Sequence, residues 1–127
     1  MILWLLFLIL IPITAHVFAK KHALQYRGTI VGASLGLVAS PVSLGLYATY
    51  FLGPYGIVTG MLGLVLVLWH VAPGYYICST LGVVPAGTVI KGTSQLAVEV
   101  SNGIFWGSIY GMLGYGLDRW RFRRKAL

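Results

Sequence analysis

Long apolar runs, separated by short polar or glycine-containing breaks, dominate the chain. An α-helix needs about 20 mostly apolar residues to cross a hydrocarbon core about 30 Å thick. The runs that approach this length cover residues 2–19, 28–52, 55–75 and 97–117. The pattern therefore predicts an all-α integral membrane protein, a small bundle of four transmembrane helices in a single domain of residues 1–127.

The run over residues 76–96 is harder to assign. It is apolar, but Gly82, Pro85, Gly87 and Gly92 interrupt it. Backbone that is broken in this way is tolerated at membrane depth only where protein or a water-filled cavity covers it. We expect a fifth short crossing, a re-entrant segment or an interfacial loop here, beside a core of four helices.

Composition agrees with a membrane location, and charge sets the orientation. Hydrophobic residues make up 58% of the chain and charged residues 9%, and the mean hydropathy is +0.88. With five crossings, eight of the nine Lys and Arg residues lie in the cytoplasm, whereas four crossings divide them five against four. The positive-inside rule favours five crossings, and both counts place the C-terminus in the cytoplasm.

The last ten residues, 118–127, form a basic tail. Its cations are Arg119, Arg121, Arg123, Arg124 and Lys125. Cations next to a membrane gain about 1 kcal/mol each from anionic lipid headgroups, and they need no folded platform for this. We therefore expect the tail to contact lipid headgroups and not nucleic acid.

Small residues recur at every fourth position in two of the predicted helices. The first stripe is Gly28, Gly32, Gly36 and Ser40, and the second is Gly103, Gly107 and Gly111. Positions four apart share one helix face, and small faces let helix backbones approach each other in lipid. These stripes predict packing faces, either within this chain or toward another chain.

The leading functional prediction is a non-enzymatic membrane subunit. Paired carboxylates, a nucleophile with a nearby base and a phosphate-binding glycine loop do not occur in the sequence, and Cys78 is the only cysteine. A chain with glycine-lined faces and almost no mass outside the membrane is suited to packing in a larger membrane complex or against copies of itself.

A polar stripe supports an alternative, a small oligomeric pore or carrier of the holin-like or ion-conducting kind. If the helix of residues 97–117 begins earlier, Lys91, Gln95, Glu99 and Asn102 fall on one face. Ionisable residues inside a membrane are rare and often mark ion or proton paths. The competing interpretation places the same residues in a solvated loop.

Two histidines support a second alternative. His16 and His70 lie at similar distances from the starts of their predicted spans, and imidazoles at equal depth can ligate haem iron or a chlorophyll-type pigment metal. Single histidines in apolar helices more often bond to a neighbouring backbone or hydroxyl group. Our main expectation is therefore a chain without a cofactor or a metal site.

Overall fold

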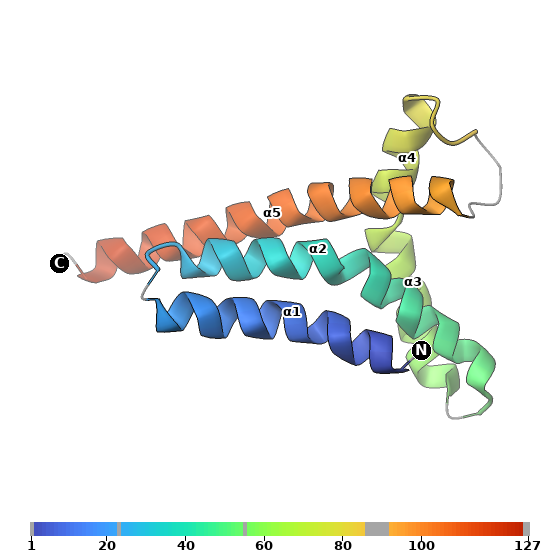
Figure 1. The fold of residues 1–127 in the computed structure, drawn as a ribbon, viewed down its shortest axis with the longest axis horizontal. Helices are drawn as coiled ribbons and strands as arrows, with labels where there is room; N and C mark the ends of the chain where they lie inside the picture. The colour runs from blue at the N-terminus through green and yellow to red at the C-terminus, as the bar shows by residue number, and fades with distance from the viewer. Residues whose placement is uncertain (1, 23, 55, 86–91, 126–127) are drawn as a thin grey trace.

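The computed structural model describes residues 2–22, 24–54, 56–85 and 92–125 (Figure 1). Within these ranges every regular element is helical, so the all-α prediction is confirmed. The elements are α1 (Ile2–Lys21), α2 (Arg27–Ala48), the 3-10 helix η1 (Thr49–Leu52), α3 (Gly56–His70), α4 (Ala72–Thr80) and α5 (Thr93–Lys125).

Helix bounds differ from the apolar runs at three places. The run 55–75 divides into α3 and α4, where Pro73 lies in the first turn of α4. The ambiguous segment 76–96 contributes the end of α4 and the start of α5, and its residues 86–91 lie outside the described ranges. The last helix continues to Lys125, so the basic tail extends α5.

Two helical stretches in the described part of the chain are long and apolar enough to cross a membrane. They are Arg27–Leu52, which joins α2 to η1, and Gly56–Thr80, which joins α3 to α4. By length and composition, the predicted spans 28–52 and 55–75 could therefore cross a membrane, and the bundle of four transmembrane helices stays a prediction.

Helix α2 occupies the centre of the arrangement. It lies between α1 and α5, and α3 and α4 run across this layer at one end (Figure 1). Its C-terminal half turns away from α5 and packs against α3. Pro41 lies inside α2, where it removes a backbone donor and crowds the preceding turn, which accounts for the change of direction.

The first glycine stripe holds α2 against α5. A Cβ atom added at Gly32 would meet the carbonyl oxygen of Tyr110, and one added at Gly36 would meet that of Trp106. The stripe predicted from its spacing is therefore a packing face within this chain, where the two backbones approach directly.

The second stripe packs less closely. Added Cβ atoms at Gly103, Gly107 and Gly111 would lie 3.4, 3.4 and 3.5 Å from their nearest neighbours, close to ordinary van der Waals contact. The tightest approach from α5 is made by Gly114, which faces the backbone of Gly28. Gly103, Gly107 and Gly111 thus face α2 at about ordinary contact distance, and the closest backbone contact of α5 lies one turn away from this stripe at Gly114.

We predict that Gly36→Ala destabilises the fold and that Gly116→Ala does not. The new methyl group at residue 36 meets backbone, so a cost of about 1–3 kcal/mol is expected. An added Cβ at Gly116 has no atom within 4 Å, and alanine there gains up to about 1 kcal/mol of helix propensity. Thermal unfolding of both variants in the same detergent checks this, and equal melting temperatures would contradict the packing described.

Candidate functional site: a buried polar row between α2 and α5

The chain has two acidic residues, and α5 carries both of them. Asp118 is 3% exposed and accepts three hydrogen bonds, from the backbone amides of Gly28 and Thr29, each at 2.9 Å, and from the Thr29 hydroxyl at 3.2 Å. These amides begin α2, which has no side-chain cap of its own at Tyr26. The Asp118 carboxylate therefore caps the N-terminus of α2 from another helix, and its negative charge interacts favourably with the dipole of α2.

Glu99 has the opposite environment. Both carboxyl oxygens are buried, and neither has a hydrogen-bond partner among the described residues. The Ser40 hydroxyl lies close to this carboxyl without a hydrogen bond of ordinary geometry. Burying a polar group without a hydrogen-bond partner costs free energy of folding. The position of Glu99 therefore needs an explanation other than packing.

Asn102 joins three helices beside Glu99. Its amide nitrogen donates to the Ser40 hydroxyl of α2 at 3.3 Å, and its carbonyl oxygen accepts from the Gly74 amide of α4 at 2.6 Å. Asn102 and Ser40 are both fully buried. A glycine is required at residue 74, because an added Cβ would meet the Asn102 side chain.

His70 forms the next part of the row. Its Nδ1 lies 3.1 Å from the Ser43 hydroxyl and 3.1 Å from the Leu66 carbonyl oxygen, and its Nε2 lies 3.0 Å from the Tyr110 hydroxyl. A proton on Nδ1 donates to the carbonyl, and Nε2 then accepts from Tyr110. The His70 carbonyl in turn accepts from the Trp106 indole at 2.9 Å.

A groove continues the row beyond Tyr110. It has a volume of about 350 Å³, and Tyr110 lines it together with His16, Arg27 and Arg121. Glu99, Asn102, Trp106 and Tyr110 follow a spacing of three and four residues along one face of α5. The polar groups therefore lie one after another along α5 from Glu99 to the groove, as a polar row made of two hydrogen-bonded groups, one around Asn102 and one around His70.

The candidate residues of the polar stripe separate in the structure. Glu99 and Asn102 lie in the row, whereas Gln95 is exposed, and Lys91 lies outside the described ranges. Sequence reasoning missed Ser43 and Tyr110, which contact His70. The spacing of Tyr110 from Glu99 along α5 was the available signal.

The two histidines have separate partners. The exposed His16 accepts a hydrogen bond from Arg27 at 3.4 Å, and both ring nitrogens of His70 lie within hydrogen-bond distance of other groups. Shared ligation of a haem or a pigment metal would require both side chains to leave these partners. Within the described residues, no group of three or more His, Cys, Asp or Glu side chains lies together as a metal site.

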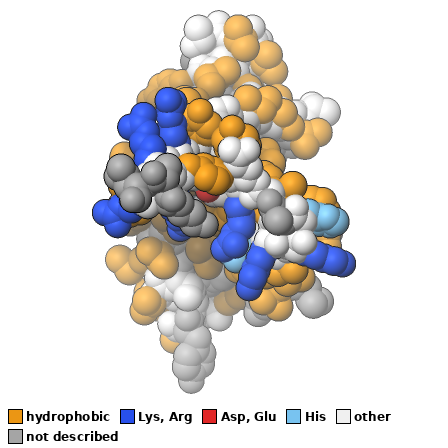
Figure 2. Space-filling view, turned by 90° about the vertical axis from the view of Figure 1, so that its left-hand side faces the viewer, with side chains coloured by type: hydrophobic (Ala, Val, Ile, Leu, Met, Phe, Trp, Pro, Cys, Tyr) orange, Lys and Arg blue, Asp and Glu red, His pale blue; other side chains and the backbone are white. Residues whose placement is uncertain are grey.

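The tail cations are exposed on the last turns of α5. These are Arg119, Arg121, Arg123 and Arg124, and Arg124 stacks over the Trp120 ring at 4.0 Å from its centroid. The side chain of Lys125 is not among those described. Figure 2 shows Lys and Arg side chains gathered at this end of the molecule.

Comparisons of the chain with protein-family models, with curated proteins and with solved structures find no match. Functional inference therefore starts from the geometry of the row and of the basic end.

We predict that Asn102→Leu destabilises the fold by about 1–3 kcal/mol, because the buried Gly74 amide loses its acceptor and the larger leucine side chain must fit in the same closely packed place. Ser108→Ala is the control, since the Ser108 hydroxyl is exposed and bonds only to the Ile104 carbonyl of its own helix. Thermal unfolding compares the two variants. If they melt at the same temperature, Asn102 does not hold the helices together.

Proposed function

We propose that the chain is a multi-pass integral membrane protein with its C-terminus in the cytoplasm. In the two stretches that are long and apolar enough to cross a membrane, 28% and 22% of the residues are buried. The core helix of a soluble protein is mostly buried, whereas a helix in lipid keeps its apolar side chains exposed. The low buried fractions support the membrane location.

The contact of Asp118 with Gly28 supports an odd number of crossings. It places the end of α5 beside the start of α2, so Arg27 and the basic tail lie on one side of the membrane. A simple count of four crossings would place them on opposite sides. The odd count is the one that gathers eight of the nine cations in the cytoplasm.

We further propose that the protein is a small carrier that binds protons at Glu99 and passes them along the polar row. The observation that carries this proposal is the difference between the two acids: backbone amides satisfy Asp118, whereas the carboxyl oxygens of Glu99 are inaccessible to solvent and accept no hydrogen bond of ordinary geometry from the described residues. Ionisable groups of this kind within a membrane commonly serve ion or proton movement.

The dimensions and chemistry of the row support the same proposal. The polar groups from Glu99 to Tyr110 extend about 17 Å along α5 at about 1.5 Å per residue, roughly half of a hydrocarbon core about 30 Å thick, and the groove lined by Tyr110 and Arg121 continues toward the basic end. The groups along this length are carboxyl, amide, hydroxyl and imidazole, and imidazole is the most common proton shuttle in proteins. We therefore infer a proton, and not a larger ion, as the transported species.

The accessory-subunit function stays a prediction, but a partner chain would have to contact a surface other than the glycine stripe of α2. The glycines of α2 pack within the chain, so a partner would meet another face. Helix α3 offers one, because Val58, Val65 and Trp69 are exposed. Lipid can cover this apolar face of α3 equally well, so its exposure does not require a partner chain. For this reason we favour the carrier function.

We predict that Glu99→Gln reduces proton flux to the background of protein-free liposomes. Glutamine keeps the size of the side chain but does not titrate. Tyr110→Phe should reduce the flux severalfold, because it removes only the hydroxyl next to His70. The matched control is Gln95→Ala, an exposed position one turn before Glu99, which should conduct like the wild type. A Glu99→Gln protein with wild-type flux would refute the proposed role.

A further inference from the structure

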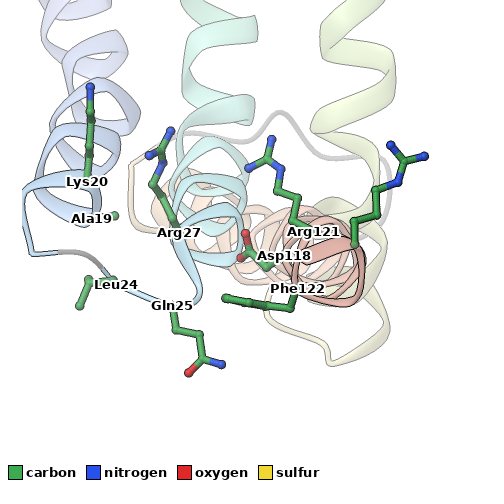
Figure 3. Close-up of a pocket in the computed structure, with 9 residues that line it drawn as sticks. Ala19, Lys20, Leu24, Gln25, Arg27, Asp118, Arg121 and Phe122 are labelled. Carbon is green, nitrogen blue, oxygen red and sulfur yellow. The ribbon is translucent and has the colours of Figure 1, made fainter. Parts of the chain in front are cut away.

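A second site lies at the basic end, between the α1–α2 connection and α5. A cavity of about 500 Å³ opens there, and Lys20, Arg27, Arg121 and Arg124 line it together with Asp118. Figure 3 shows the side chains of Lys20, Arg27 and Arg121 extending to the same side of the ribbon. The cavity thus draws its cations from the consecutive helices α1 and α2 and from the distant helix α5.

The charge of the cavity favours an anion. Four cations and one carboxylate leave three net positive charges in its lining, and the carboxylate of Asp118 is directed to the backbone of α2. Arginine presents a planar fork of N–H donors, which suits the oxygens of a phosphate group. Arg27, Arg121 and Arg124 all offer this fork, and of these Arg27 and Arg121 also line the neighbouring groove.

An apolar groove continues from this cavity. The groove that runs beside Tyr110 shares Arg27 and Arg121 with the cavity, and its other walls include Leu35, Leu113 and Leu117. These leucines are 46%, 63% and 54% exposed, so the groove opens on the outer surface of the helices. Cationic cavity and apolar groove together fit a molecule with a phosphate head and a hydrocarbon tail.

We propose that this composite site binds one anionic phospholipid, with its phosphate on Arg27 and Arg121 and an acyl chain along the groove. The site lies where α1 ends and α2 begins, at the end of the helices where headgroups are expected. The proposal rests on the membrane location proposed above, but not on proton transfer at Glu99. A soluble phosphate compound would use the arginines alone and leave the groove empty.

Native mass spectrometry of the detergent-solubilised protein, titrated with phosphatidylglycerol, tests the site. We expect one bound lipid, and about 30-fold weaker binding for the double variant Arg27→Gln/Arg121→Gln, because each substitution removes a charge-assisted hydrogen bond to the phosphate. The control Arg119→Gln/Arg123→Gln removes the same charge from tail positions outside the cavity. Because Arg119 and Arg123 line neither the cavity nor the groove, this change removes only longer-range attraction to the headgroup and should weaken binding by no more than about fivefold.

Three results would overturn the proposal: an equal loss in both double variants, phosphatidylcholine binding as tightly as phosphatidylglycerol, or glycerol 3-phosphate competing as well as the lipid. The last result would indicate a site for soluble phosphate compounds. Arg27→Lys/Arg121→Lys keeps the charge and should retain more binding than the glutamine pair, which separates loss of the ligand from loss of the fold. The measured quantity is the mass of bound lipid, so the outcome does not depend on the proton-flux assay.

Discussion

The direct backbone contact between α2 and α5 is the constraint on which the rest of the structure depends. Gly32 and Gly36 let the carbonyls of α5 approach α2 without intervening side chains, and this sets the register of the two helices. In that register Asn102 meets Ser40, and Asp118 reaches the first amides of α2. A shift of one turn would leave these amides without their carboxylate, so packing and hydrogen bonding select the same alignment.

This alignment also gives the two acids different roles. Asp118 has backbone donors and stabilises the start of α2, whereas the Glu99 carboxyl lies beside the Ser40 hydroxyl without a hydrogen bond of ordinary geometry among the described residues. A chain with so few acids retains a buried, unpaired carboxyl at a cost in stability. That cost is consistent with a proton-binding role for Glu99 within the polar row, and the groove beside Tyr110 connects the end of the row with the basic end that is proposed to bind lipid.

The features that the sequence predicted are those that short-range residue patterns determine. The helical class and the α2 packing face follow from apolar length and from the spacing of Gly28, Gly32 and Gly36. Long-range pairing was not predictable, because Asp118 caps an amide 90 positions away and nothing in the intervening sequence specifies which helix α5 meets. The shared depth inferred for the two histidines assumed parallel spans, but α3 runs across the layer that contains α1 (Figure 1).

The central claim is that Glu99 is the one acid available for proton binding within the membrane. Reaction of membrane-reconstituted protein with the apolar reagent dicyclohexylcarbodiimide, followed by peptide mass spectrometry, tests it most directly. We predict that Glu99 is modified and that Asp118 is not, because backbone donors already occupy the Asp118 carboxylate. Modification of Asp118 with Glu99 left intact, or equal modification of both, would contradict the account.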